Sequence, residues 1–235
     1  MRFGRLLFAA ALAALSLLAV KAEPTFAQSY GYAEHAPGTD LTAEGNRFYQ
    51  NGWFFTARHR FKRAAHWADK MAQHNLGVIW YRGDGVERDP ARAWAWFELA
   101  AERDYPEFVG IANAVWDELS PVDRQRGRAY LDDLMPRYED AVAVPRTARR
   151  MTWDRRQVTG SRVGFVGNLE IYDIDSAVPR SGEEYFSEET WDFEQIVSRE
   201  KQLFDALARA RVTIGEMEFV EDEADQDDPG ARDGR

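Results

Sequence analysis

Across residues 72–106, small and apolar side chains recur every three or four positions, the spacing of one helical face. This pattern predicts two helices separated by a polar segment. Gly83 and Gly85 can adopt the positive φ angles that end the first helix. Asp89 and Pro90 suit the first turn of the second helix, because aspartate caps free N–H groups and proline needs no hydrogen bond there. The side chains on the two predicted faces are Ala72, Leu76, Ile79, Trp80, Ala93, Trp96, Phe97, Ala100 and Ala101.

The same pattern returns in weaker form on both sides of this helix pair. At an interval of 36 residues, Phe61 corresponds to Phe97 in one direction and Trp116 to Trp80 in the other. A pair of this kind buries its apolar face only by stacking on neighbouring pairs. Residues 40–144 are therefore predicted to form a short α-solenoid of stacked antiparallel helix pairs, in a chain that is mostly α-helical.

The segment AQHNLGVIWYRGDGVERDPARAWAWFELAAERD resembles a Sel1-like repeat, a relative of the tetratricopeptide repeat of roughly 36 residues. The resemblance is strong over residues 72–105, weaker over 42–71 and weakest over 106–140. It implies a right-handed α-superhelix that presents a surface to partner proteins. The positions that match the repeat are Ala72, Leu76, Gly77, Trp80, Gly83, Gly85, Asp89, Ala93, Phe97, Ala100 and Ala101.

A smaller region with strands is predicted beyond the repeats, in residues 162–212. Gly167–Asn168 is typical of a two-residue turn, which predicts a hairpin with strands at 162–166 and 169–174. Apolar side chains over residues 188–211 predict a final helix. Because an isolated hairpin is marginally stable in water, this region is expected to pack on the helices, on a second copy or on a partner.

Three polar segments are predicted to lie outside the folded parts. Residues 145–161 hold five arginines and show no periodicity, which indicates a basic linker. Residues 23–39 also lack a pattern and are predicted to be disordered. Residues 213–235 are predicted to be a disordered acidic tail, since 216–235 hold nine acidic and two basic residues and bury little apolar surface. A tail that pairs with the arginines is the alternative to a solvated one, although exposed ion pairs contribute only about 0–1 kcal/mol each.

The first residues have the layout of a secretory signal peptide, with two arginines, an apolar run over 6–20 and a small residue at the end. Cleavage is predicted after Ala22, so that the signal covers residues 1–22, with Ala27 as an alternative site. The apolar run is shorter than the roughly twenty residues of a bilayer span, although an uncleaved anchor stays open. The protein is therefore predicted to be periplasmic or secreted, with no integral span after removal of the signal.

Charge and cysteine content narrow the partners and the chemistry. Loss of residues 1–22 removes three basic and no acidic side chains and moves the net charge from −10 to −13. Nonspecific binding to nucleic acid requires clustered Lys and Arg, so nucleic acid is not an expected partner. The chain has no cysteine, which excludes disulfides, thiol chemistry and a lipid-modified N-terminal cysteine.

The residue types of catalytic and metal sites do not fall into a recognisable arrangement. His59, His66 and Asp69 can share a helical face, but a metal needs three or four convergent ligands and basic side chains surround these residues. The glycines at 83 and 85 follow a predicted helix, whereas a dinucleotide site requires a strand before its glycines. No catalytic residue, metal or cofactor is predicted.

Aromatic and arginine side chains are better candidates for function, because they anchor protein–protein interfaces. By their period, Trp80, Trp96 and Phe97 are expected in the core. The basic segment from Arg58 to Arg63 is expected either to receive an acidic peptide or to be a solvated face. The predicted partner-binding residues are Trp53, Arg58, Arg60, Tyr81, Arg82 and Trp94.

These features predict an exported, non-catalytic scaffold or adaptor that binds a protein or peptide in the groove of a short solenoid. This prediction rests on an analogy at the level of the fold. A cell-envelope enzyme or cell-wall-binding protein with an unrecognised site in the C-terminal region is an alternative, which a tight cleft with convergent polar groups in residues 150–212 would favour. A homodimer held by the hairpin and the final helix is a further possibility.

Overall fold

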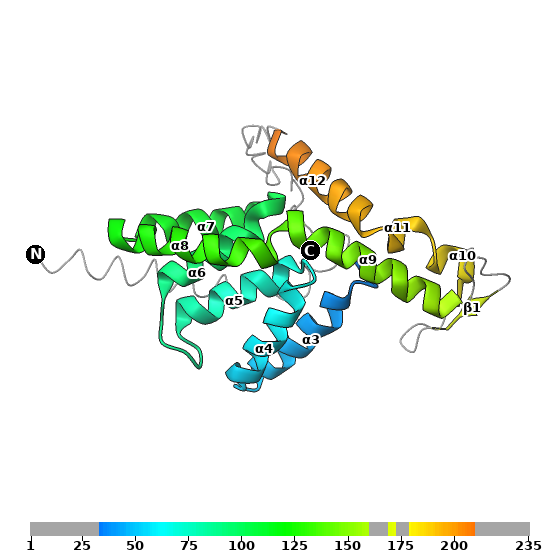
Figure 1. Cartoon of the computed structure of the whole chain (residues 1–235), viewed down its shortest axis with the longest axis horizontal. Helices are drawn as coiled ribbons and strands as arrows, with labels where there is room; N and C mark the ends of the chain where they lie inside the picture. Colours follow the sequence, from blue (N-terminus) through cyan, green and yellow to red (C-terminus); the bar gives the residue numbers. More distant parts are fainter. Residues whose placement is uncertain (1–32, 160–168, 173–178, 210–235) are drawn as a thin grey trace, which may run out of the picture.

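The computed structural model of the protein describes residues 33–159, 169–172 and 179–209, and this part is mostly α-helical, as predicted (Figure 1). The only strands in these residues form one short two-stranded pair. The elements are α3 (Pro37–Gln50), α4 (Phe54–Ala65), α5 (Lys70–Arg82), α6 (Pro90–Ala100), the 3₁₀ turn η1 (Ala101–Arg103), α7 (Pro106–Glu118), α8 (Pro121–Tyr138), α9 (Asp140–Thr159), β1 (Glu170–Ile171), β2 (Arg180–Ser181), α10 (Gly182–Tyr185), α11 (Glu188–Trp191) and α12 (Phe193–Arg209).

Two successive helix pairs, α3–α4 and α5–α6, are built around the same contact. In each pair the ring of a phenylalanine on the second helix lies on a glycine of the first. A Cβ atom added at Gly45 would lie 2.5 Å from the ring of Phe61, and one at Gly77 would lie 2.5 Å from the ring of Phe97. The correspondence between Phe61 and Phe97 in the sequence is therefore a structural repeat, and the solenoid prediction is confirmed over these pairs.

The next two helices, α7 and α8, both pack on α6. Trp94 of α6 is buried at this junction, where its ring centroid lies 4.5 Å from that of Trp116 on α7. Gly127 of α8 lies against the other part of the ring, since a Cβ atom added there would be 2.8 Å from Cε3 of Trp94. The weakest stretch of the sequence repeat thus attaches through one large ring and one small residue.

The predicted linker at 145–161 is wrong over its described part, because residues 140–159 form the long helix α9. Ala143, Thr147 and Met151 have no exposed surface and are spaced at i, i+4 and i+8 along α9. Ala143 and Met151 pack on α11 and α12 in a second core. Proline lacks the N–H for one helical hydrogen bond, but Pro145 lies in the second turn, and burial of this face stabilises the helix across it.

The C-terminal elements lie along α9, at the right and top of Figure 1. The described strand pair joins β1 to β2, with Glu170 opposite Ser181 and Ile171 opposite Arg180. The pairing of Glu170 and Ile171 with β2 uses one edge of β1, so the predicted pairing of 169–174 with 162–166 stays a prediction. The predicted partner strand and its turn lie outside the described residues.

The predicted helix over 188–211 is divided in two at Asp192. This residue has extended backbone angles and accepts a hydrogen bond from the backbone N–H of Gln195 at 3.1 Å, as an N-cap does. The break allows both Trp191 and Phe193 to be buried. Without it, these rings, two positions apart, would lie on opposite sides of one helix.

The chain is ordered earlier than the sequence predicts. Helix α3 starts at Pro37, and Thr39 Oγ1 donates to the carbonyl oxygen of Ala33 at 3.0 Å. The prediction of disorder over 23–39 is thus wrong for residues 33–39. Its remainder, the predicted signal at 1–22 and the predicted tail at 213–235 lie outside the described residues.

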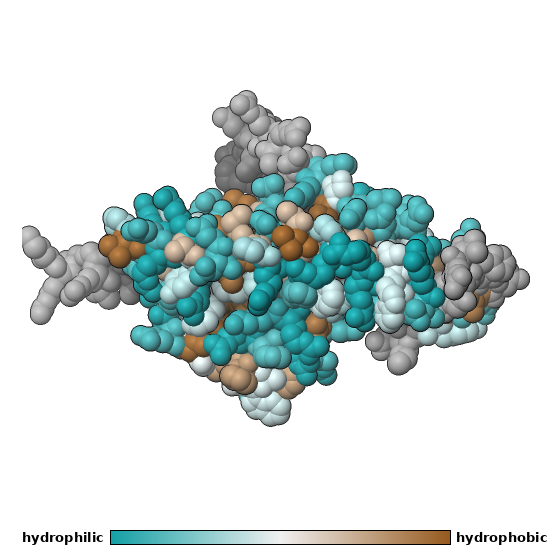
Figure 2. Space-filling model, viewed as in Figure 1, coloured by the Kyte–Doolittle hydropathy of each residue, from teal (hydrophilic) through white to brown (hydrophobic). Residues whose placement is uncertain are grey.

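The surface of the described part is mostly hydrophilic, with separate hydrophobic patches on the face seen in Figure 2. Large exposed apolar side chains include Trp53 and Phe55 at the turn between α3 and α4. None of the helices in the described residues is both long and apolar enough to cross a bilayer.

Candidate binding groove

A groove of about 520 Å³ opens between the repeat helices and α8. This volume lies in the range of typical ligand pockets. Four helices contribute to the walls, namely α4, α5, α6 and α8. The lining residues are Lys62, Trp80, Arg92, Trp96, Tyr130, Asp133, Leu134, Pro136, Arg137 and Tyr138.

Aromatic rings and arginines alternate in a series whose middle members, Trp80, Arg92 and Tyr130, line this groove. The guanidinium carbon of Arg92 lies 4.3 Å from the ring centroid of Trp80 and 4.5 Å from that of Tyr130, so the group is held between two rings. The guanidinium carbon of Arg58 lies 5.6 Å from the same Trp80 ring centroid. Such contacts are favourable because the ring face is negative. We call the series Phe55, Arg58, Trp80, Arg92, Tyr130 and Arg126 the arginine–aromatic ladder.

The backbone and side chain of Arg92 are fixed by different contacts. Its backbone N–H donates to Oδ1 of Asp89, the N-cap of α6, at 3.2 Å. Its side-chain Nε lies 4.0 Å from Oδ2 of Asp89, which is too long for a hydrogen bond. The guanidinium of Arg92 therefore has no hydrogen-bond acceptor among the described residues, although its plane is held by the two rings.

Positive charge accumulates at the groove. The pKa of Lys62 is lowered, first by burial and then by the like charges of Arg58, Arg92 and Arg137. Within the described part of the chain, Lys62, Arg58 and Arg137 make no ion pair. Asp133 is the one acidic residue of the lining. A chain with net charge −10 thus has a local basic site.

Of the predicted partner-binding residues, Arg58 is the one that lies on the ladder. Arg60 turns to α3 and pairs with Glu44 at 3.1 Å. Trp94 was expected to line the groove, and this prediction is wrong because its ring is buried in the junction of α6, α7 and α8. Trp94 lies beside the predicted buried stripe of α6, and its ring packs on Trp116 of α7 and Gly127 of α8.

The remaining predicted residues lie apart from the groove lining. Trp53 is exposed and stacks on Phe48, with 5.6 Å between ring centroids. The Tyr81 hydroxyl donates to Glu118 at 2.8 Å, and the guanidinium of Arg82 donates to the Tyr49 hydroxyl at 3.2 Å. Trp53, Tyr81 and Arg82 each contact another side chain of the protein, and the structure does not bring these three residues together.

Arg92, Tyr130 and Arg137 line the groove but were not predicted, and the sequence gives little indication of their role. Arg92 is two positions from a recognised helix start, but its stacking requires Tyr130, which lies in the weakest stretch of the repeat. Arg137 and Tyr130 share a face of α8, seven positions apart. This face does not separate from the rest of α8 in the sequence, because polar residues surround it on all sides.

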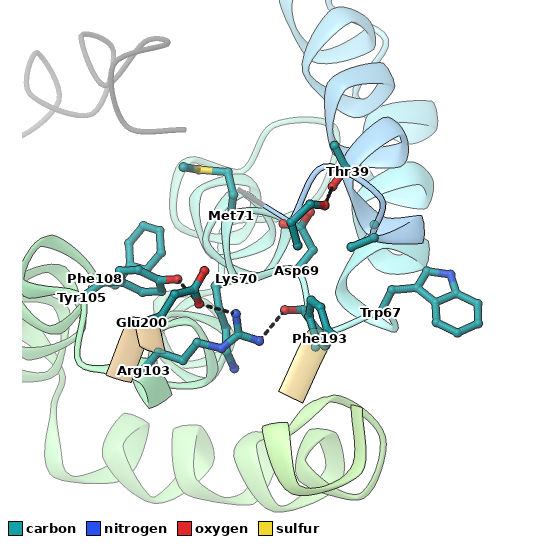
Figure 3. A pocket seen from close by; sticks show the side chains of 14 residues that line it. Thr39, Trp67, Asp69, Lys70, Met71, Arg103, Tyr105, Phe108, Phe193 and Glu200 are labelled. Carbon is teal, nitrogen blue, oxygen red and sulfur yellow. Dashed lines mark hydrogen bonds and ion pairs between the residues drawn. The ribbon is translucent and has the colours of Figure 1, made fainter. Parts of the chain in front are cut away.

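A second, smaller cavity of about 80 Å³ lies where α12 meets α5 and η1 (Figure 3). Arg103 donates to Asp140 at 2.8 Å, to Glu200 at 3.1 Å and to the carbonyl of Ala68 at 2.9 Å. The Tyr105 hydroxyl donates to Glu200 at 2.8 Å. Figure 3 shows the side chains of Arg103, Tyr105 and Glu200 pointing toward one another.

The charged side chains at this cavity are paired with one another. Lys70 pairs with Glu102 and, at 3.0 Å, with Asp140. Burial alone would raise the pKa of Asp140, but Arg103 and Lys70 outweigh it and lower the pKa. Burial raises the pKa of Glu200, whose carboxylate pairs with Arg103 at 3.1 Å. We name Lys70, Glu102, Arg103, Asp140 and Glu200 the ionic clamp, since they join α9 and α12 to the repeats.

The residues considered as metal ligands do not converge. His59 is exposed on α4, and the Nδ1 atom of His66 lies 3.0 Å from the guanidinium of Arg146. Asp69 caps α5 by accepting from the backbone N–H of Ala72 at 2.8 Å. In the described residues no group of three or more His, Cys, Asp or Glu is arranged to hold a metal ion.

The family model of the Sel1 repeat matches residues 70–105, which cover α5, α6 and η1. This segment is a Sel1 repeat. A solved structure similar to the chain is that of a protective antigen present in uropathogenic Escherichia coli strains, which displays an SLR fold. The identity is 23%, the TM-score is 0.41, and the match covers 60% of this chain and 28% of that chain. Comparison with curated proteins finds no match.

The Sel1 repeat supplies both the frame and the centre of the groove. Gly83 ends α5 with a φ of 82°, and Asp89 caps α6. Gly85 has a φ of 67° and lies against Phe54, since an added Cβ atom would be 2.8 Å from that residue's Cβ. Ala72, Leu76, Ala93 and Ala100 are fully buried, Phe97 is buried, and Ala101 is half-buried.

Trp80 differs from the expectation for a core residue, because it is half-buried whereas Trp96 is buried. One part of its ring faces Arg92 and the groove. Its indole Nε1 is buried and has no hydrogen-bond partner among the described residues. Trp80 and Arg92 both belong to the Sel1 repeat, so the repeat itself provides the middle of the ladder.

Proposed function

We propose that this chain is a non-catalytic scaffold or adaptor that binds a segment of a partner protein in the groove. The single observation that carries the proposal is the state of Arg92, a guanidinium held between two rings with its donors unused by the described residues. Trp, Tyr and Arg dominate the energetic centres of protein interfaces. Sel1 repeats generally mediate protein–protein interaction, which agrees with this use of the groove.

The chemistry of the groove supports binding rather than acid–base catalysis. A general acid or base works best when its pKa lies near the operating pH. Two of the four charged residues in the lining, Arg92 and Arg137, are arginines, which stay protonated in proteins. Such groups hold an anion in place but do not transfer protons.

The proposal is tested by site-specific photocrosslinking in cells. A photoreactive amino acid replaces Asp133, which lines the groove, and in a matched control it replaces the neighbouring Asp132, which is exposed on α8 outside the lining. We expect position 133 to capture a defined protein and position 132 not to. Equal capture at both positions, or none at position 133, would refute binding in the groove.

We also propose that the chain acts after export from the cytoplasm. The support is the layout of residues 1–22, in which an apolar run follows two arginines. Residues 1–28 are fused to a reporter enzyme that needs disulfides for activity. The fusion is expected to be active, and the same fusion with Leu12→Arg inactive. Activity of both fusions, or of neither, contradicts export by this segment.

A further inference from the structure

We infer that the groove binds an extended protein segment rich in carboxylates, with Arg92 as the central anchor; this inference rests on the proposed function. The chemical reason is charge complementarity. Arg58, Lys62, Arg92 and Arg137 lie close enough that the first, third and fourth lower the pKa of Lys62. No described acid pairs with Arg58, Lys62 or Arg137, so a ligand with several carboxylates would relieve this repulsion.

The stacked geometry of Arg92 suits a carboxylate in particular. Its planar guanidinium presents parallel N–H donors that match the two oxygens of a carboxylate. Trp80 and Tyr130 hold that plane from both sides at 4.3 and 4.5 Å. Since the side chain is already ordered, less conformational entropy is lost when the ligand binds.

At one end of the ladder, an arginine already binds carboxylates that belong to the protein itself. Arg126 lies 5.9 Å from the Tyr130 ring and pairs with Asp123 at 2.8 Å and Asp89 at 3.2 Å. A ladder arginine therefore already holds carboxylates of the chain itself. Because those acids satisfy Arg126, the site for a ligand extends from Arg92 in the other direction, toward Arg58 and Phe55.

An acidic protein segment fits these observations better than a nucleic acid. Affinity for nucleic acid grows with the number of phosphates neutralised, and strong binding uses many contacts over an extended surface. The basic site is local, and the chain as a whole carries a net charge of −10. The rings between the cations give a peptide apolar contact area, so acidic residues alternating with apolar ones are the expected ligand.

The test is a fluorescence anisotropy titration of the full chain. The probe is a labelled twelve-residue peptide that alternates Glu with Leu, and the control probe has Gln in place of Glu. The acidic peptide is expected to bind at least about tenfold more tightly, and its affinity should fall as salt is added. A labelled single-stranded oligonucleotide of equal length is the third probe, and it is expected to bind more weakly than the acidic peptide.

Variants of the protein separate the anchor from general charge. Arg92→Gln is expected to weaken binding of the acidic peptide about tenfold or more, because charge-assisted hydrogen bonds are lost. Arg92→Lys keeps the charge but loses the planar fork and is expected to be intermediate. Arg126→Gln, the matched control on the same ladder, is expected to change affinity less than about twofold since its donors are already used. Thermal melts establish that each variant is folded.

Several results would overturn the inference. These are equal binding of the acidic and Gln peptides, equal loss in Arg92→Gln and Arg126→Gln, or tighter binding of the oligonucleotide. Residues 216–235 are another source of carboxylates, so the titration is repeated with a chain that ends at residue 212. Tighter binding by that chain would show that the tail competes for the groove, which supports the same chemistry.

Failure of the inference is distinguishable from failure of the proposed function. If position 133 captures a partner and excess acidic peptide prevents capture, both stand. If capture occurs and the acidic peptide neither binds nor competes, the scaffold stands and the acidic ligand is refuted. If no partner is captured but the acidic peptide binds through Arg92, the groove chemistry is right and the scaffold proposal is wrong.

Discussion

At the scale of the residue, glycine sets how closely the paired helices approach. A methyl group at Gly77 would lie 2.5 Å from Cε1 of Phe97, which is closer than atoms can come without movement. Gly77→Ala is therefore expected to lower the free energy of unfolding by about 1–2 kcal/mol, since overpacking costs about 1–3 kcal/mol and better helix propensity recovers at most about 1 kcal/mol. Urea denaturation measures the change.

A matched glycine on α7 provides the control. Gly110 is exposed, and an added Cβ atom would have no neighbour within 4 Å. Gly110→Ala is expected to raise the free energy of unfolding by about 0.5–1 kcal/mol through helix propensity alone. If both variants were stabilised, the glycine–phenylalanine contact would not be the constraint that joins α5 to α6.

His74 makes the stability of the fold depend on pH. Its ring lies between Phe97 and Phe108, at centroid distances of 5.3 and 4.9 Å, and its Nδ1 is buried without a partner among the described residues. Burial, with a smaller contribution from Arg82, lowers the pKa to about 4 from a model-compound value of 6.5. As the pH falls, His74 therefore binds a proton at a higher pH in the unfolded chain than in the folded chain.

The direction of the pH effect follows from this order of protonation. The contribution of His74 is complete above pH 6.5 and is lost as the pH falls from 6.5 toward 4. At pH 5 the loss reaches about 2 kcal/mol relative to pH 7. His74→Phe is expected to remove that part of the difference between urea curves at the two pH values. His59→Gln, at an exposed position, should retain it, and equal pH dependence in all three proteins would contradict the assignment.

At the scale of the element, the ionic clamp decides whether α12 stays on the repeats. Arg103 is buried and is held by Asp140 and Glu200, so its removal takes the cation partner from Glu200 and leaves Asp140 with Lys70. Arg103→Met is expected to lower the free energy of unfolding by about 3–5 kcal/mol. Hydrogen exchange should show the loss first in α12, which is joined to η1 through this contact.

An exposed arginine serves as the comparison for the clamp. Arg126 also contacts two carboxylates, those of Asp123 and Asp89, but its side chain is 49% exposed. Arg126→Met is expected to have a much smaller effect, because water replaces the lost partner. Unchanged exchange in α12 of Arg103→Met would mean that apolar contacts alone hold this helix.

The elements show which parts of the fold the sequence can predict. Helices α5 and α6 follow from local rules, because Asp69 and Asp89 cap their starts and Gly83 ends the first. Helix α9 does not, since its buried face includes Thr147 and crosses Pro145, and each of these lowers a local helix signal. Its stability comes from contacts with α11 and α12, which the local sequence does not encode.

At the scale of the whole molecule, the groove depends on residues that no local pattern connects. Trp80 and Arg92 belong to the Sel1 repeat, but Tyr130 reaches them only because α8 packs on α6. The sequence therefore predicted the solenoid, and of its predicted partner-binding residues Arg58 lies on the ladder. The sequence placed Trp94 in the groove because periodicity shows only that this residue lies off the main apolar stripe of α6. Periodicity does not show that α7 and α8 cover it.

The packing of the C-terminal helices on α9 bears on the oligomeric state. A homodimer through the final helix would need free apolar surface there, yet Trp191, Phe193, Ile196 and Val197 are buried within one chain. We therefore expect light scattering to give the mass of one chain, 27.0 kDa for the full sequence, across a range of concentrations. The physical reason is that Trp191, Phe193 and Val197 already pack on α9 in the second core.

A dimer mass would locate the contact elsewhere and can be traced. Trp53 and Phe55, at the turn between α3 and α4, are 61% and 73% exposed. If a dimer forms, the double variant Trp53→Ala, Phe55→Ala should dissociate it, whereas Phe193→Ala should unfold the C-terminal elements without that effect. Dissociation by Phe193→Ala in a chain that stays folded would instead restore the final helix as the interface, and would show that the intramolecular packing on α9 is exchanged between two copies.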